Sequence, residues 1–359
     1  MTDVPSSPAS GRRLPGTKRA RIIFGAAVVA LVAVTAGFAL TGGGGSHAGP
    51  TDARHASTTT AAKKPGARGV IAPLTGVRDL SGGSAHRPAL TVKIDNLKVA
   101  HPQSGLDWAD VVYEEVVEGL QTRLLAIFQS HVPPLVGPIR SVRRTDQGVV
   151  TPIGGIFVYS GGAQYAIDSI RSAPVNLVDE TRAGSAMFRD HSRVKPYNLF
   201  GRPAALFAFG GNPVPPPPLF NYRGAHAPVA GTAVTHVGVG FAGDFAVSYD
   251  WDLKRAVWNR SIFGAPDVLV SGVQLAPRNV VVMLVQYAGG AGIEGAEAET
   301  VGRGDAVIFT AGHRIDCRWV RPDRAKPARF LDAKGAVVRL TPGQTWVELA
   351  PTGTAITGS

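Results

Sequence analysis

The pattern of apolar and polar positions begins with one uninterrupted apolar run, Ile22–Leu40. As a helix these nineteen residues span about 28 Å, close to the thickness of the hydrocarbon core of a bilayer. The preceding residues 1–21 carry several Lys and Arg side chains, which favour the cytoplasmic side of a membrane. The pattern therefore predicts a cytoplasmic basic segment and a single transmembrane helix, with the rest of the chain outside the membrane.

Cleavage of this segment as a signal peptide is the alternative, because Gly37-Phe38-Ala39 has the small-x-small spacing of a cleavage site. The protein would then be secreted. The apolar run is longer than is usual for a signal peptide, so we expect a retained anchor. A lipid anchor is not expected, because the only cysteine, Cys317, lies far from the N-terminus.

Residues 41–70 show no apolar periodicity and are rich in Gly, Ser, Thr and Pro, which predicts a flexible linker. Residues 71–211 alternate strand-like and helix-like patterns, which is typical of an α/β domain. Strands are expected at 89–94, 110–118, 122–129 and 156–159. Residues 110–118 could also form a helix, because Glu114 and Glu118 would then share one face. A helix is expected around Tyr165, Ile167 and Ile170.

Residues 212–224 contain four consecutive prolines, which favour an extended conformation and predict a linker between two domains. Short β-rich runs with Gly and Asp between them follow in residues 225–352. The expected strands lie at 245–249, 280–285, 306–309, 336–340 and 346–349. The predicted fold class is thus α+β, with an N-terminal α/β domain and a β-rich C-terminal domain.

The formal net charge of +11 belongs mostly to the N-terminal segments. Residues 1–69 hold nine Lys and Arg against two acidic residues, whereas the remaining residues hold 28 against 24. A folded part with so small an excess is not expected to bind nucleic acid. The single cysteine excludes an internal disulfide, and Cys317 is expected to be a buried thiol in a strand rather than a nucleophile.

The densest group of charged residues lies between Gly137 and Asp146. Pro138 suits the first turn of a helix, which would place Arg140, Arg143 and Arg144 near its N-terminus as a cradle for phosphate or carboxylate. The alternative is a structural ion network in which these arginines pair with Glu114, Glu115 or Glu118.

A second polar cluster, residues 189–198, is predicted to be a functional loop. Within it His191 is either a general base or simply solvated, and at the end of the first strand Asp95-Asn96 either orients a ligand or caps the next segment. On one strand Glu114 and Glu118 would lie roughly 13 Å apart, too far for a glycosidase pair. No metal site, cofactor motif or hydrolase motif is found. The candidate ligand-binding residues are Asp95, Asn96, Glu114, Glu118, Arg123, Arg140, Arg143, Arg144, Arg189, Asp190, Arg193 and Asn198.

Several motifs in order resemble the YerB-like envelope lipoproteins (DUF3048), a two-domain bacterial family of unknown function. The resemblance covers residues 72–350. It rests on RPALTVKIDN (87–96), PQSG (102–105), ADVVYE (109–114), VEG (117–119), TRLLAIFQS (122–130), GPIRS (137–141), YSGG (159–162), FRD (188–190), PYN (196–198) and GQTW (343–346).

The resemblance implies an exported protein attached to the membrane. Two departures from the family pattern are Tyr197, where members often carry histidine, and the absence of an N-terminal lipidation cysteine, which Ile22–Leu40 would replace. We therefore expect a cell-envelope protein that binds an anionic glycan or a lipid-linked precursor. The alternatives are an envelope-assembly enzyme, either a glycopolymer transferase or a hydrolase, and a protein-interaction scaffold.

Overall fold

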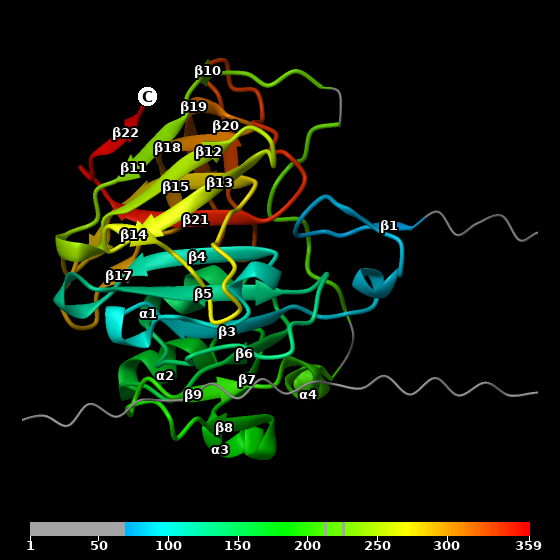
Figure 1. Ribbon diagram of the computed structural model, residues 1–359, viewed down its shortest axis with the longest axis vertical. Helices are drawn as coiled ribbons and strands as arrows, with labels where there is room; N and C mark the ends of the chain where they lie inside the picture. The colour runs from blue at the N-terminus through cyan, green and yellow to red at the C-terminus, as the bar shows by residue number, and fades with distance from the viewer. Residues whose placement is uncertain (1–68, 212–213, 225–226) are drawn as a thin grey trace, which may run out of the picture. The chain divides into compact units, whose positions relative to one another are not determined.

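The computed structural model describes residues 69–211, 214–224 and 227–359 (Figure 1). These residues belong to one compact unit, Lys63–Ser359. The predicted basic segment 1–21, the predicted span Ile22–Leu40 and all but the end of the predicted linker 41–70 lie outside the described residues. Among the helices that are described, none has the length and apolar character needed to cross a membrane.

The N-terminal half is the predicted α/β domain. Its main strands are β3 (Leu90–Asp95), β4 (Val111–Val116), β5 (Thr122–Phe128), β6 (Ile156–Val158) and β7 (Asn176–Val178), and its main helices are α1 (Arg144–Val150) and α2 (Gln164–Arg171). The shorter elements are β1 (Val70–Ile71), β2 (Arg78–Asp79), β8 (Met187–Arg189), β9 (Leu199–Gly201), α3 (Glu180–Ala183) and α4 (Pro203–Leu206). β4 and β5 form the predicted hairpin, in which Gly119 has a positive φ of 69°. β3, β6 and β7 run parallel to one another.

The C-terminal half consists of strands, as the sequence predicts. They are β10 (Thr232–Ala233), β11 (His236–Val239), β12 (Val247–Asp252), β13 (Val257–Ile262), β14 (Ala265–Pro266), β15 (Asn279–Val285), β16 (Tyr287–Ala288), β17 (Glu297–Ala298), β18 (Gly302–Thr310), β19 (His313–Arg321), β20 (Arg329–Leu331), β21 (Thr345–Pro351) and β22 (Ile356–Gly358). Five of them form a second sheet in the order β14-β13-β12-β11-β22. This sheet packs on the larger sheet that contains β18. The contact is made by Trp258 of β13, whose ring meets Phe309 of β18 edge-on.

One sheet of eleven strands runs through both halves (Figure 1). Its order is β10-β19-β18-β15-β21-β4-β5-β3-β6-β7, with β20 beside β19. The two halves meet where β21 pairs in parallel with β4 on one side and with β15 on the other. The Pro-rich segment 212–224 therefore lies between the halves in sequence, while the sheet continues across them.

The helix that Pro138 predicts does not form. The backbone of residues 137–140 instead crosses the end of β3, where the Pro138 carbonyl accepts from Asp95 N–H at 3.0 Å and Arg140 N–H donates to the Lys93 carbonyl at 2.8 Å. These bonds use the groups that a helix would need, so α1 begins only at Arg144. Arg140 therefore lies in extended backbone outside α1.

The strand predicted at 336–340 is also wrong. Only isolated bridges form there, between Val337 and Leu331 and between Leu340 and Tyr222. Asp332 accepts hydrogen bonds from the backbone N–H groups of Lys334 and Ala336, which holds residues 332–336 in a tight turn and prevents a continuous ladder.

Candidate functional site

Charged side chains lie on both faces of the sheet near the junction of the two halves. Glu114 and Glu115 are consecutive in β4, so their side chains point to opposite faces. Both are fully buried. The face of Glu115 holds a guanidinium cluster and a lysine triad, and the face of Glu114 holds a network around Arg260.

The guanidinium cluster consists of Arg123, Arg140 and Arg143 with Asp95 and Glu118. Arg123 on β5 lies directly opposite Asp95 on β3. The Arg140 Nε lies 2.5 Å from Asp95 Oδ2, and the Arg143 Nε donates to Glu118 Oε2 at 2.7 Å. Arg123 Nη2 donates to the other oxygen of Glu118 at 3.2 Å. Of the three carboxylates named in the alternative of a structural ion network, only Glu118 pairs with these arginines. Arg140 pairs with Asp95 instead, and Glu114 and Glu115 pair with Arg260 and Lys93.

The guanidinium cluster holds three cations against two carboxylates, and this excess affects its ionisation. Burial and the charge of Arg143 lower the pKa of Arg123 to about 10. Burial opposes ionisation of Glu118, but the hydrogen bond from Arg143 and the charges of Arg123 and Arg143 outweigh it and lower the pKa of Glu118 to about 2. Both carboxylates are engaged by the cluster, and Arg143 is also under the charges of Glu115 and Asp146, which lie on the same face.

Backbone donors border this cluster. Residues 140–142 lie beside residues 160–161, since Ser160 N–H donates to the Arg140 carbonyl and Val142 N–H donates to the Gly161 carbonyl. The N–H groups of residues 161–163, which lead into α2, donate to no other group in the described part of the chain. The exposed Arg144 lies 5.5 Å from the ring of Tyr165 on α2. Free N–H groups at the start of a helix attract anions.

The lysine triad consists of Lys93, Glu115 and Asp146, none of which is exposed. Lys93 Nζ donates to a Glu115 carboxylate oxygen and, at 2.7 Å, to Asp146 Oδ1. The other oxygen of Asp146 accepts from Arg143 N–H at 2.7 Å, which ties the triad to the start of α1. Burial raises the pKa of Asp146 to about 7, although the charge of Lys93 opposes the shift.

The Arg260 network joins the two halves on the opposite face. Arg260 on β13 donates to Glu114 Oε2 at 2.6 Å and to a carboxylate oxygen of Asp267, and its guanidinium lies 4.4 Å from the ring centroid of Trp346. Glu348 on β21 lies directly opposite Glu114 in the ladder and accepts a hydrogen bond from Tyr249. Only one permanent cation faces three carboxyl groups. Burial and the neighbouring Glu114 accordingly raise the pKa of Glu348 well above its usual value.

This network predicts that the protein loses stability as the pH rises. A carboxyl group whose pKa is higher in the folded state keeps its proton while the unfolded chain releases one, so the free energy of unfolding falls from about pH 4.5 upward. Glu348→Gln imitates the protonated side chain. We expect the variant to match the wild type at pH 4, to exceed it in urea midpoint at pH 8 and to show a shallower pH dependence; equal slopes would contradict a neutral Glu348.

Side chains of the loop at 189–198 hold it through hydrogen bonds within the loop and to Glu180 and Ala100. Arg189 donates to Glu180 Oε1 at 2.8 Å and to Asn198 Oδ1 at 2.9 Å. Asp190 accepts from Ser192 N–H at 2.9 Å, and Arg193 donates to the Ala100 carbonyl at 3.1 Å. His191 is exposed.

The structure thus brings five predicted residues together in the guanidinium cluster, with Arg144 beside them. Asn96 and Glu114 lie in the Arg260 network, where Asn96 donates to Glu114 at 3.0 Å. Arg189, Asp190 and Asn198 share the separate loop, and Arg193 contacts residues 100–102. Asp95 also caps the turn after β3, accepting from Leu97 N–H at 2.8 Å, as expected. Sequence reasoning missed Lys93, Asp146, Arg260, Asp267 and Glu348.

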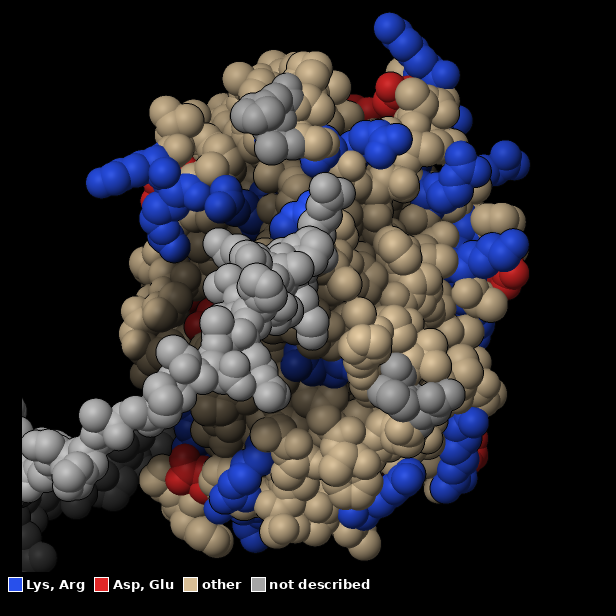
Figure 2. Space-filling view, turned by 90° about the vertical axis from the view of Figure 1, so that its right-hand side faces the viewer, with Lys and Arg blue, Asp and Glu red and all other residues tan. Residues whose placement is uncertain are grey.

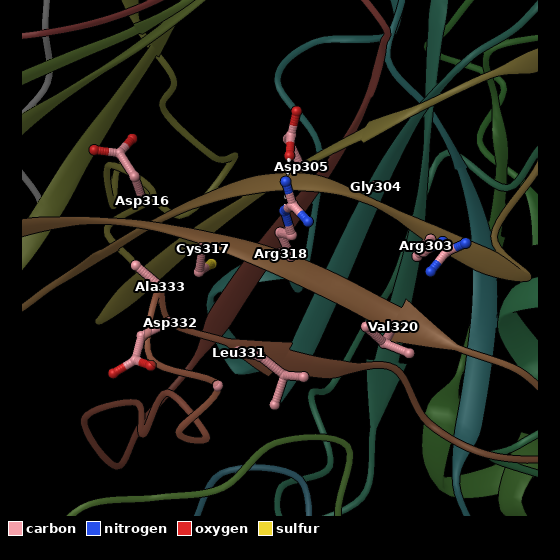
Figure 3. Close-up of a pocket in the computed structure, with 11 residues that line it drawn as sticks. Arg303, Gly304, Asp305, Asp316, Cys317, Arg318, Val320, Leu331, Asp332 and Ala333 are labelled. Carbon is pink, nitrogen blue, oxygen red and sulfur yellow. Dashed lines mark ion pairs between the residues drawn. The ribbon is translucent and has the colours of Figure 1, made fainter.

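A broad hollow lies elsewhere, in the C-terminal half. Figure 2 shows more Lys and Arg than Asp and Glu on the surface of the face it presents. A hollow of about 730 Å³ lies over β18, β19 and β20 and is bordered by the turn at 332–335 (Figure 3). None of the predicted ligand-binding residues lines it. Cys317 lies behind it in β19, where burial raises the pKa of its thiol to about 12, as expected for a structural cysteine.

The fold and these clusters define a two-domain mixed α/β protein whose halves share a sheet. Residues 74–211 and 237–347 match the N-terminal and C-terminal domains described as protein of unknown function DUF3048. The chain belongs to this family, which confirms the resemblance.

Two comparisons connect the chain to a protein of Bacillus subtilis. "Putative lipoprotein YerB" of strain 168 is 28% identical over 299 residues, which cover 79% of this chain and 87% of YerB. The crystal structure of YerB superposes with a TM-score of 0.69 at 24% identity and covers 80% of this chain and 99% of that chain. The two proteins therefore share a fold across both domains.

Proposed function

We propose that this protein is exported and attached to the membrane, and that its N-terminal half binds an anionic envelope glycan or a lipid-linked glycan precursor. Attachment and export are supported by the apolar run Ile22–Leu40 and by the description of YerB as a lipoprotein. In this proposal the apolar run anchors the chain in place of a lipid.

The excess of guanidinium groups over carboxylates at the end of β3 carries the ligand proposal. The side chains of Arg140 and Arg143 keep 19% and 14% of their surface exposed, so an anion can reach them without unfolding the cluster. Arg144 adds a more exposed cation, and the N–H groups of residues 161–163 add donors beside it. A phosphate or carboxylate of the glycan would accept charged hydrogen bonds from these guanidinium groups.

Aromatic rings flank the same place. The Arg140 guanidinium lies 5.2 Å from the ring centroid of Tyr197, and Arg144 lies 5.5 Å from that of Tyr165. A cation over the face of an aromatic ring is attracted to it, so each ring helps to hold its arginine in place. Arg189 and Arg193, which engage their own loop and residues 100–102, have a smaller part in this proposal than Arg140, Arg143 and Arg144.

Calorimetric titration of residues 63–359 with a phosphate-bearing wall glycan tests the proposal. Losing charged hydrogen bonds typically weakens binding by about 1.5–3 kcal/mol, so Arg140→Gln/Arg144→Gln is expected to lower the affinity at least about tenfold. Arg171→Gln, which removes an exposed cation at the far end of α2, is the matched control and should leave the affinity unchanged.

Equal affinity of the double variant and the wild type would contradict the proposal, as would equal binding of an uncharged glycan. If the wild type consumes the glycan and the double variant does not, the alternative of an envelope-assembly enzyme gains support.

A further inference from the structure

Positive charge is concentrated in one segment of the folded part. Residues 302–340, from β18 to the turn after β20, hold nine Lys and Arg against four Asp and Glu. The other residues from 70 onward hold 19 against 20. The small positive excess of the folded part therefore comes entirely from β18–β20 and their connections.

Arginines of this segment share one face of the sheet. Arg303, Val320 and Arg329 are directly paired across β18, β19 and β20, and Arg318 lies in the neighbouring row on the same face. Arg303, Arg318 and Val320 line the hollow of Figure 3, and the turn that carries Lys334 borders it. We call Arg303, Arg318, Arg329 and Lys334, all of which are exposed, the basic face.

The carboxylates near the basic face already have partners. Asp316 lies 2.9 Å from Arg314, and Asp332 accepts the two backbone N–H groups of its own turn. Asp305 lies 3.7 Å from Arg318. Within the described residues, Arg303, Arg329 and Lys334 form no ion pair. The charges of Arg303, Arg329 and Lys334 are therefore available to a partner.

The start of the described chain lies beside this region. The Thr75 carbonyl accepts from Gly343 N–H at 2.8 Å, and the Leu74 carbonyl accepts from the Tyr222 hydroxyl. The Tyr222 carbonyl in turn accepts from Arg339 at 3.5 Å. Residues 74–75, near the start of the described chain, thus lie next to the end of the basic segment.

The aromatic residues of this segment are not available for stacking on sugars. Phe309, Trp319 and Phe330 are 0%, 2% and 5% exposed. The basic face instead presents separate cationic side chains, and Val320 and Leu331 are partly exposed between them. This composition fits the headgroup region of an anionic membrane, where each basic residue near the surface adds attraction and short apolar side chains are tolerated.

From these observations we propose that the basic face docks onto an anionic phospholipid surface and holds the folded part against the membrane that carries its anchor. The occupant is the lipid headgroup layer, which is a different ligand and a different surface from those of the proposed glycan site.

The test uses the full chain reconstituted in vesicles of phosphatidylcholine with or without phosphatidylglycerol. Ala333→Cys, in the exposed turn, carries an environment-sensitive dye, and Ala205→Cys on α4 carries it in a control preparation. Cys317 is buried and does not compete for the label. We expect the emission of the dye at 333 to shift to the blue only with phosphatidylglycerol, and to revert when the salt is raised from about 0.05 M to about 0.5 M.

The variant Arg303→Gln/Arg329→Gln/Lys334→Gln removes three charges and should weaken docking about 100-fold. Arg171→Gln/Lys254→Gln/Arg255→Gln removes the same charge from other exposed positions and should dock like the wild type. An equal loss in both variants, or a wild-type signal independent of phosphatidylglycerol and salt, would overturn the proposal. A shift that soluble polyphosphate produces on neutral vesicles, with none from phosphatidylglycerol, would assign the face to a polymer and also overturn it.

Discussion

Replacing Arg260 with methionine is expected to lower the free energy of unfolding by about 3–5 kcal/mol, because breaking a buried ion pair leaves its partners charged and desolvated. Arg260 is completely buried and, among the described residues, is the only permanent cation in contact with Glu114 and Asp267. Methionine has a similar length and packs against Trp346, so the loss measures charge rather than a cavity. Urea unfolding of residues 63–359 gives the value.

Two controls separate the charge from other effects of Arg260→Met. Arg255→Met changes an exposed arginine in the turn between β12 and β13 and should alter stability by less than about 0.5 kcal/mol. Adding Glu114→Gln and Asp267→Asn to Arg260→Met should restore part of the loss, because no unpaired charge then remains. A loss below about 1 kcal/mol for Arg260→Met would show that Arg260, Glu114 and Asp267 do not form the charged network described above.

Lys93→Met is expected to have a comparable effect, about 3–5 kcal/mol at pH 7, through the other face of the sheet. Its ammonium group is bonded to Glu115 and Asp146, which would then face each other without a cation. Both carboxyl groups would take up protons more readily, so the variant should regain stability as the pH falls toward 4. Urea midpoints from pH 4 to 8 give this comparison.

Exposed Lys98 provides the matched control for Lys93. Lys98→Met should stay within about 0.5 kcal/mol of the wild type at every pH. If Lys93→Met were destabilised equally at pH 4 and pH 7, lost packing rather than unpaired carboxylates would explain the effect.

Local patterns predicted the parts of the fold whose partners are close in sequence. The β4–β5 hairpin follows from two apolar runs around Gly119, and α2 follows from its helical spacing of apolar residues. The helix predicted from Pro138 was wrong because the Pro138 carbonyl accepts a hydrogen bond from the N–H of Asp95, a residue distant in sequence. The start of α1 is therefore set by tertiary hydrogen bonds that a local rule does not contain.

The charged clusters were predictable only where one segment supplies most of the members. Arg140, Arg143 and Arg144 stand out in the sequence, whereas Glu114 and Glu348 meet because β4 and β21 pair in a particular register. One local signal was available. Consecutive Glu114 and Glu115 in an apolar strand place a carboxylate on each face, so burial of the strand requires a buried cation on both sides.

The pairing of β21 with β4 has a consequence for the order in which the chain folds. The chain emerges from the ribosome with its N-terminus first, so β4 is complete long before residues 345–351 exist. Until then β4 and β15 each lack a neighbour that only β21 supplies, and both present unpaired backbone groups to other chains. β21 therefore completes the sheet of both halves, and a chain that stops before Thr345 would be prone to aggregate rather than fold as a shorter domain.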